Sequence, residues 1–293
     1  MSRAAVARVA MTLLLALGFT YAGLLLLLKL SENRIVFPVA PWGGGLAAPL
    51  AGLEPVRVEA TTADGVTLVG WRMGDPSDTS GRWLLMFHGN GGDISNGSRQ
   101  EHYAALRRLG LHLLTFDYRG YGESTGDPSE AGVYRDADAA YAYLRATLGV
   151  PPERVLIFGH SLGAAVAVDL ASRVEARALV LEGAFTSVPD VGQRTYFFVP
   201  VRLMARNRFA SDEKIGRVAV PKLFLHATRD EVIPYDLGER LFALAPEPKR
   251  FVPIIGGHND AWAADAATYL GSVARFLREL DQLGRDTGRR LPP

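Results

Sequence analysis

Five residues, Gly159-His160-Ser161-Leu162-Gly163, constrain the fold of this chain more than any other segment because of their flanks. Residues 154–158 form a short apolar run with strand propensity, and residues 164–168 are small residues that can begin a helix. A G-x-S-x-G segment between a strand and a helix holds its serine at the apex of a tight turn with the hydroxyl exposed. The glycines permit this strained turn, and N–H groups at the helix start can stabilise an anion. We therefore predict that Ser161 is a nucleophile.

A second match to the same pattern, Gly122-Glu123-Ser124-Thr125-Gly126, has different surroundings. No apolar strand leads directly into it, and Asp127-Pro128 comes directly after it, where a helix would have to begin. These turn signals predict a loop, and we expect no chemistry from Ser124.

Length and composition exclude several classes of protein. The chain has 293 residues, a net charge of +1 and no cysteine. The charge gives no reason to expect nucleic acid as a partner. The missing cysteines exclude disulfides, a thiol nucleophile and a cysteine zinc site. We expect neither a metal nor an organic cofactor, the oligomeric state is not indicated, and abundant Ala, Arg, Leu and Gly suggest a bacterium with a GC-rich genome.

The N-terminal region contains a candidate membrane anchor. After a tail at residues 1–8, residues 9–28 are uncharged and rich in leucine, and twenty helical residues span about 30 Å. We expect a retained single-pass anchor; a cleaved signal peptide and a buried helix are the alternatives. Arg3 and Arg8 precede the span, whereas Lys29 and Arg34 follow it. This balance slightly favours an inside amino terminus, with the catalytic domain outside a bacterial inner membrane.

The rest of the chain reads as one domain of alternating strands and helices. Residues 29–55 are predicted to be an irregular connector, with Phe37 and Trp42 as aromatic residues at the membrane interface. The predicted domain covers residues 56–284 and is followed by a tail at 285–293. It begins with a hairpin at 56–60 and 66–73, joined through Asp64-Gly65. Further strands are predicted at 83–87, 111–116, 154–158, 178–181, 222–226 and 250–255, and helices at 98–109, 129–148, 162–174, 237–244 and 261–283. Such alternation predicts a mostly parallel sheet covered on both faces, with the antiparallel hairpin at one edge.

The partners of Ser161 can be found by elimination. Where a G-x-S-x-G turn carries the nucleophilic serine, the acid follows the serine in the sequence and the histidine follows the acid. Only His226 and His258 follow Ser161. His226 ends a strand, and we expect no acid at a strand end between Ser161 and His226. His258 lies in a loop after the strand 250–255, where active sites of open α/β sheets are found, and is the predicted base.

The predicted acid is Asp230, a few residues beyond the strand 222–226. Asp236 and Asp212 are poorer candidates, because one begins a helix and the other lies in an insertion. Taken singly, a loop aspartate is usually a turn residue and a loop histidine is usually just exposed. A triad of Ser161, Asp230 and His258 is favoured because the acid and the histidine occur in the expected order and each follows a strand.

An oxyanion hole needs two N–H groups. One is expected from Leu162, directly after the nucleophile. The loop 88–92, His-Gly-Asn-Gly-Gly, follows the strand 83–87, and we expect the second donor to be the backbone of Asn90. The alternative is a plain glycine turn. His88 is expected to brace this loop.

Together these segments resemble the α/β-hydrolase superfamily, over roughly residues 34 to 280. The chain looks like its membrane-anchored serine hydrolases, which include lysophospholipase-like and acyl-thioesterase-like members. The resemblance rests on residues 88–92, on Phe-Asp-Tyr-Arg-Gly-Tyr-Gly-Glu-Ser at 116–124, and on Gly-His-Ser-Leu-Gly at 159–163. It implies hydrolysis of lysophospholipids, other acyl lipids or acyl thioesters on proteins, although some relatives are peptidases. It also makes 116–124 a structural loop beside the site.

The cap insertion usual in this superfamily is expected to be short here, at about residues 184–215. Phe197 and Phe198, followed by Arg202, Arg206 and Arg208, could line an acyl pocket and face anionic headgroups. An ordinary helix with solvated arginines fits the same pattern.

We therefore expect a membrane-anchored serine hydrolase that cleaves acyl esters or thioesters, with lipids or lipidated proteins favoured. A serine peptidase with the same triad is the enzymatic alternative. A catalytically silent hydrolase scaffold serving as an interaction module is the other alternative.

Overall fold

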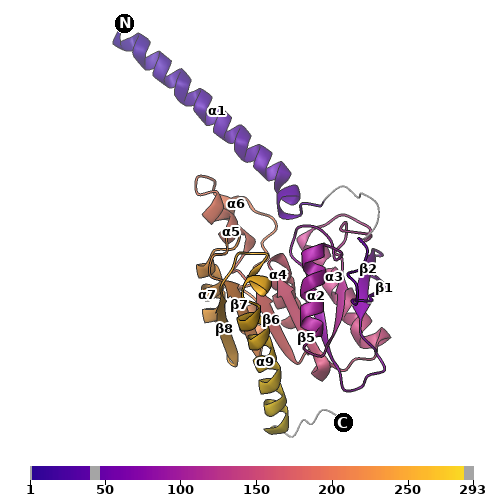
Figure 1. The fold of residues 1–293 in the computed structure, drawn as a ribbon. Helices are drawn as coiled ribbons and strands as arrows, with labels where there is room; N and C mark the ends of the chain where they lie inside the picture. Colours follow the sequence, from indigo (N-terminus) through magenta and orange to yellow (C-terminus); the bar gives the residue numbers. More distant parts are fainter. Residues whose placement is uncertain (1, 40–46, 287–293) are drawn as a thin grey trace.

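A central sheet of eight strands organises the protein, and its strands run in the order β1-β2-β4-β3-β5-β6-β7-β8 (Figure 1). The structure is a computed structural model that describes residues 2–39 and 47–286. The strands are β1 (Val56–Thr61), β2 (Thr67–Met73), β3 (Arg82–Phe87), β4 (Leu111–Phe116), β5 (Val155–His160), β6 (Ala178–Glu182), β7 (Lys222–Ala227) and β8 (Lys249–Ile254).

The strand directions match the prediction of a mostly parallel sheet with an antiparallel edge. β1 pairs antiparallel with β2 around a turn in which Gly65 has a φ of 81°, and β2 pairs antiparallel with β4. All other neighbouring pairs are parallel. The carboxyl ends of β3, β5, β6, β7 and β8 therefore meet at one edge of the sheet.

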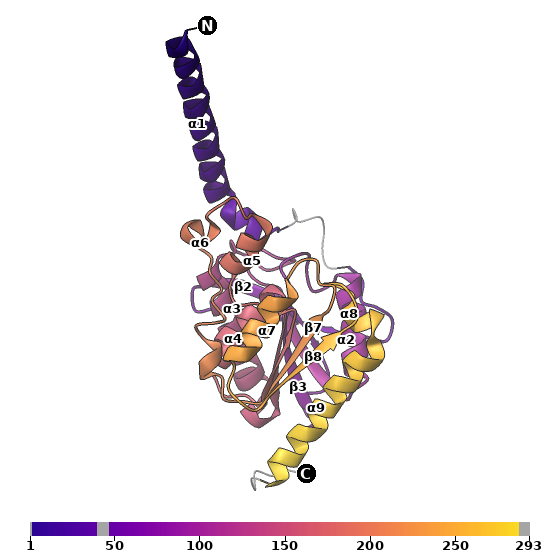
Figure 2. The ribbon, with the colours of Figure 1, turned by 90° about the vertical axis from the view of Figure 1, so that its left-hand side faces the viewer.

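Helices cover both faces, as predicted (Figure 2). One face carries α3 (Glu130–Ala142), α4 (Leu162–Ala171) and α7 (Tyr235–Leu244), and the other carries α2 (Gly97–Arg107) and α9 (Ala266–Asp286). Each face has its own apolar core, and all ten residues of α4 are buried. The helix predicted over 261–283 is divided at Asp265 into α8 (Ala261–Ala264) and α9. The helix predicted over 129–148 ends as a π-helical turn at Tyr143–Thr147.

The N-terminal helix α1 (Arg3–Val36) projects from the domain on the side of α5 and α6 (Figures 1 and 2). It is long and apolar enough to cross a membrane. It begins six residues before the predicted span 9–28 and ends eight residues after it. None of its residues is buried, so the alternative of a buried helix was wrong.

The connector after α1 differs from the prediction at Phe37. This ring is buried and packs edge-on against Phe209, with ring centroids 5.9 Å apart. It belongs to the core rather than to a membrane interface. Trp42 lies outside the described residues.

The predicted insertion 184–215, which we call the cap, holds two short helices, α5 (Val188–Thr195) and α6 (Val201–Met204). A 3-10 turn at Ile215–Arg217 follows and leads back to the sheet. The cap packs against the C-terminal part of α1, where Glu32 Oε1 accepts hydrogen bonds from the backbone N–H groups of Arg206 (2.6 Å) and Asn207 (2.7 Å). The cap and α1 are therefore packed together beside the carboxyl edge of the sheet.

Candidate active site

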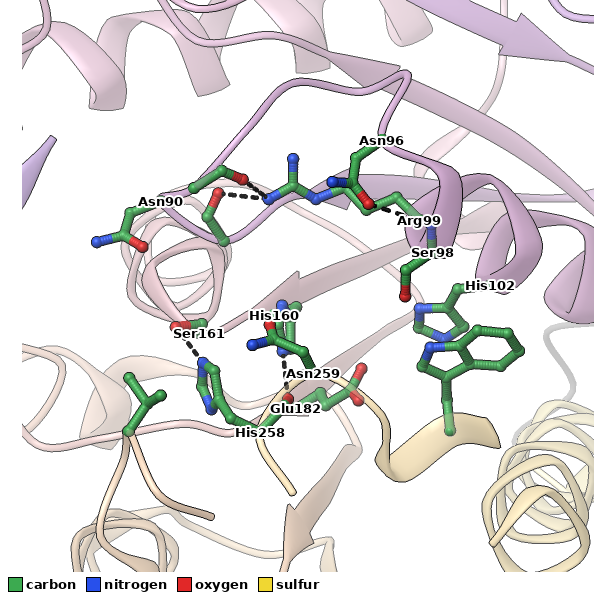
Figure 3. Close-up of a pocket in the computed structure, with 14 residues that line it drawn as sticks. Asn90, Asn96, Ser98, Arg99, His102, His160, Ser161, Glu182, His258 and Asn259 are labelled. Atoms are coloured by element: carbon green, nitrogen blue, oxygen red, sulfur yellow. Dashed lines mark hydrogen bonds between the residues drawn. The ribbon is translucent and has the colours of Figure 1, made fainter. Parts of the chain in front are cut away.

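The carboxyl edge of the sheet encloses a cavity of about 450 Å³ (Figure 3). Its walls come from the loop after β3, the elbow after β5, the end of β6 and the loop after β8, together with α2. Ser161 and His258 both line it.

Ser161 occupies a strained elbow between β5 and α4. Its φ of 55° and ψ of −120° are unusual for a residue other than glycine. The neighbouring glycines explain how the elbow closes. A β-carbon at Gly163 would lie 2.1 Å from the carbonyl oxygen of Phe87, and one at Gly159 would lie 2.1 Å from that of Gly163. The predicted strand–turn–helix around Ser161 is therefore present, and only glycine fits on either side of it.

The structure brings the three residues of the predicted triad into one hydrogen-bonded chain. Nε2 of His258 lies 2.9 Å from Oγ of Ser161, and Nδ1 of His258 lies 2.8 Å from Oδ2 of Asp230. All three side chains are shielded from solvent. An ionised carboxylate can only accept a hydrogen bond, so Nδ1 of His258 carries the proton and Nε2 is free to accept from the serine hydroxyl.

The environment of Asp230 keeps its carboxyl ionised. Burial acts to raise its pKa, but hydrogen bonds outweigh burial and the pKa is lowered. Oδ2 accepts from His258, and Oδ1 accepts from the N–H groups of Ile233 (2.7 Å) and Val232 (2.9 Å). The carboxylate is thereby fixed in position toward the imidazole.

The expectation that no acid lies at a strand end between Ser161 and His226 was wrong. Glu182 is the last residue of β6, so an acid does stand at a strand end between Ser161 and His226, contrary to expectation. Its Oε2 accepts a hydrogen bond from the Tyr269 hydroxyl at 2.8 Å. The ring of His226 is buried, and its Nε2–H donates to the carbonyl of Ile233 at 3.1 Å. Neither residue replaces Asp230 or His258 in the chain to Ser161.

Glu182 nevertheless belongs to the cavity wall, and burial raises its pKa to about 7. The sequence contained a signal for it, an acid at the carboxyl end of a strand beside the one that carries the serine. That signal was overlooked because the strand was expected to end one residue earlier.

The two residues predicted to form the oxyanion hole are Leu162, directly after Ser161, and Asn90, in the loop after β3. Leu162 is the first residue of α4, so its N–H has no partner within the helix. Asn90 follows β3 and lines the cavity, and its backbone N–H donates to no residue in the described parts of the chain. Its side-chain Nδ2 instead donates to the carbonyl of Val36, at the end of α1, at 3.2 Å.

Arg99, on α2, holds the loop that carries Asn90. Its guanidinium donates to the carbonyls of Asp93 (2.6 Å), Gly89 (3.0 Å) and Gly91. His88 adds a hydrogen bond from Nδ1 to the carbonyl of Gly89 at 2.7 Å, and its ring does not line the cavity. Arg99 was not predicted from the sequence, because no local sequence pattern indicates that a helix residue bonds to the loop before it.

The part of the cavity beyond Ser161 is polar. In Figure 3, Asn90 and His102 mark opposite ends of the cavity, and Ser161 lies nearer to Asn90. His102 stacks on Trp262 with ring centroids 5.2 Å apart, and burial lowers its pKa to about 3. The polar side chains that complete this wall are Asn96, Ser98, Arg99, Glu182 and Asn259. A neutral imidazole and amide groups are suited to a polar part of a ligand.

The second G-x-S-x-G segment has no helix or strand, in agreement with the predicted loop. Oγ of Ser124 donates to the carbonyl of Asp117 (2.8 Å) and accepts from the N–H of Val69 (2.9 Å). Both hydrogen-bonding roles of this hydroxyl are thus used within the fold.

Phe197 and Phe198 do not line the cavity with Ser161. They lie on the loop between α5 and α6 and are 82% and 52% exposed. Of the three arginines that follow them in the sequence, Arg202 pairs with Asp190 (2.7 Å) and Arg208 pairs with Glu213 (2.6 Å). The expected acyl pocket of Phe197 and Phe198 is therefore not part of this cavity.

No group of three or more His, Asp or Glu residues in the described chain is arranged to hold a metal ion.

A mostly parallel sheet with a serine at the elbow between its central strand and a buried helix is the architecture of an α/β hydrolase. A sequence profile of the alpha/beta hydrolase family matches residues 84–292. The chain therefore belongs to the alpha/beta hydrolase family.

Several relatives extend this comparison. An uncharacterized protein of Mycobacterium tuberculosis is 41% identical over 266 residues, which cover 90% of this chain and 93% of the relative. Lysophosphatidylserine lipase ABHD12 of Danio rerio is 34% identical over 218 residues, 68% of this chain, and this chain spans about half (55%) of that lipase. The solved structure of Pyrococcus furiosus esterase Pf2001 superposes with a TM-score of 0.68 at 21% identity, covering 82% of this chain and 98% of the esterase. The esterase supports the fold, and the sequence relatives support a hydrolase.

Proposed function

We propose that the protein is a membrane-anchored serine hydrolase that cleaves acyl esters or thioesters through an acyl-enzyme. The observation that carries this proposal is the hydrogen-bonded chain from Ser161 through His258 to Asp230. The name of the Danio rerio relative, a lysophosphatidylserine lipase, supports an acyl lipid as the substrate class.

In the first half of the reaction, Oγ of Ser161 attacks the acyl carbonyl carbon while its proton passes to Nε2 of His258. Asp230 stabilises the imidazolium that forms. The N–H groups of Asn90 and Leu162 stabilise the oxyanion of the tetrahedral intermediate. The bond to the leaving oxygen or sulfur then breaks, and His258 gives its proton to the leaving group.

In the second half, water attacks the acyl-enzyme and gives a proton to Nε2 of His258. Collapse of the second tetrahedral intermediate breaks the bond to Oγ of Ser161. The acid leaves, and the serine takes back its proton from His258. These steps use side chains and backbone groups of this chain alone.

The contacts between α1 and the domain support the proposed membrane anchor. The last turns of α1 are bonded to the cap through Glu32, and Phe37 continues into the core. A segment built into the domain in this way fits a retained anchor better than a cleaved signal. Arg3 and Arg8 favour an inside amino terminus, with the domain outside the bacterial inner membrane.

The orientation can be tested by single-cysteine labelling, because the natural chain has no cysteine. In intact cells, a membrane-impermeant maleimide is expected to label Glu153→Cys in the domain but not Ser2→Cys. The reverse pattern would place the domain inside the cell.

The hydrolase proposal is tested by labelling the detergent-solubilised protein with a fluorescent fluorophosphonate. Labelling is expected in the wild type and in Ser124→Ala, and it should be lost in Ser161→Ala. No labelling of folded wild type would refute the proposed nucleophile and favour a silent scaffold. Comparing p-nitrophenyl esters with aminoacyl amides then separates an esterase from a peptidase.

A further inference from the structure

The structure contains a second hollow, of about 110 Å³, between α1 and the cap. We call it the α1–cap groove. One wall is formed by Leu28, Ile35 and Val36 of α1, and the other by Val188, Val199 and Ala205 of the cap. We propose that this groove binds the acyl chain of the substrate; this inference rests on the proposed hydrolase function.

The chemistry of the groove suits a hydrocarbon. The two charged residues at its rim, Lys29 and Glu32, are engaged with the cap backbone: Lys29 Nζ donates to the carbonyl of Met204, and Glu32 accepts from Arg206 and Asn207. The other residues that line the groove are apolar, apart from the Tyr196 hydroxyl. An acyl chain placed there would exchange water for apolar contacts, which is favourable in proportion to the area covered.

The cavity around Ser161 does not offer such a surface. Its walls beyond Ser161 carry Arg99, Glu182 and Asn259. A polar leaving group can be bound there, whereas an acyl chain in the same place would desolvate these groups without pairing them. The two halves of an amphiphilic ester therefore need different sites.

The groove and the Ser161 cavity are adjacent. Val36 lines the groove, and its carbonyl accepts the hydrogen bond from the Asn90 side chain. Asn90 lines the cavity at the end nearer to Ser161 (Figure 3). A carbonyl carbon held at Ser161 can thus direct its acyl chain past Asn90 toward α1 and its leaving group toward His102.

The outer end of the groove lies along the candidate membrane span. Leu28 is the last residue of the uncharged stretch 9–28. Above it, the Tyr21 hydroxyl donates to the carbonyl of Phe198 at 2.6 Å, so the loop with Phe197 and Phe198 stands beside the part of α1 expected inside the bilayer. A volume of 110 Å³ holds only part of a long chain, and the rest would remain among the lipid tails. The substrate would accordingly enter sideways from the membrane.

The test is to fill the groove with Ala205→Trp in the full chain, reconstituted in lipid nanodiscs. The matched control is Leu203→Trp, two residues earlier on α6, where Leu203 is 87% exposed and lies outside the groove. The measured quantity is the ratio of kcat/KM for p-nitrophenyl decanoate to kcat/KM for p-nitrophenyl acetate. Each buried methylene contributes roughly a factor of four, so this ratio is expected to fall by about tenfold or more in Ala205→Trp alone. An unchanged ratio in a variant that still hydrolyses the acetate would overturn the proposal.

A binding experiment tests the groove independently of catalysis. A sixteen-carbon fatty acid with a diazirine near its methyl end is cross-linked to Ser161→Ala and mapped by mass spectrometry. Labels are expected on both walls, within 28–36 and 196–205, and should fall when Ala205→Trp is added but not Leu203→Trp. Labels spread evenly along 9–28 would mean bulk lipid and would refute the groove. If the wild type hydrolyses no ester, the proposed function fails, and this experiment alone decides whether the groove binds an acyl chain.

Discussion

Gly183 lies against the imidazole of His258: a β-carbon at position 183 would be 3.3 Å from Cε1 of that ring and 3.6 Å from Oδ2 of Asp230. Gly183 directly follows β6 and has a φ of 57°, which favours glycine. The residue after β6 thus sets how closely the backbone approaches the proposed base.

We predict that Gly183→Ala lowers kcat for a soluble p-nitrophenyl ester by about tenfold to a hundredfold, because displacing a catalytic group by less than 1 Å has effects of this size. The matched control is Gly149→Ala. Gly149 has a φ of 66°, and its β-carbon would meet no atom within 4 Å. Both variants carry a similar backbone strain of about 1 kcal/mol, but only Gly183→Ala touches the site. Equal kcat in the two variants would show that the contact with His258 is of no consequence.

Asp230→Asn is predicted to lower kcat by about 10³- to 10⁴-fold while leaving the fold intact. The amide is nearly isosteric but no longer stabilises an imidazolium or holds Nδ1 of His258 protonated. The control is Asp236→Asn, whose carboxylate lies at the surface in an ion pair with Arg194. Kinetics on the same soluble ester should show near wild-type kcat for the control. If Asp236→Asn caused the loss instead, the acid would have been wrongly assigned.

Ser124→Ala is predicted to destabilise the protein without removing fluorophosphonate labelling. The buried hydroxyl bonds to Asp117 and Val69, and leaving both backbone groups unpaired costs about 1 to 3 kcal/mol. Chemical denaturation of the detergent-solubilised protein measures the change in free energy of unfolding. An unchanged free energy of unfolding would mean that water replaces the hydroxyl at no cost.

Local patterns were sufficient to predict the architecture and the positions of Ser161, Asp230 and His258. The reason is geometric: parallel strands end at one edge, so residues just beyond strand ends must lie near one another. The position of the loop with Asn90 is explained by the same rule, since it is the segment directly after β3.

The residues that were missed depend on contacts that are distant in the sequence. The partner of Glu182 is Tyr269, 87 residues later on α9. Phe37 comes after a membrane-like span, so it reads as an interfacial residue, yet its ring packs on Phe209. No local sequence pattern predicts such partners, because they depend on how helices and strands pack against one another.

Glu182 offers a prediction on pH. Burial raises the pKa of its carboxyl from 4.5 to about 7, so the folded state binds this proton more tightly than the unfolded state. The free energy of unfolding therefore decreases as pH rises from about 4.5 to about 7, by roughly 3 kcal/mol for this group alone. Glu182→Gln keeps an acceptor for the Tyr269 hydroxyl but cannot ionise. It should lack this part of the pH dependence.

The measurement is the free energy of unfolding between pH 4.5 and pH 7.5 for the wild type, Glu182→Gln and the exposed-site control Glu153→Gln. The difference between Glu182→Gln and the wild type is expected to grow with pH in favour of the variant. Glu153→Gln should behave like the wild type, because Glu153 is exposed and does not line the cavity. A constant difference across this range would mean that Glu182 is ionised in the folded protein as readily as in the unfolded chain, and that solvent or another charge reaches it in the cavity.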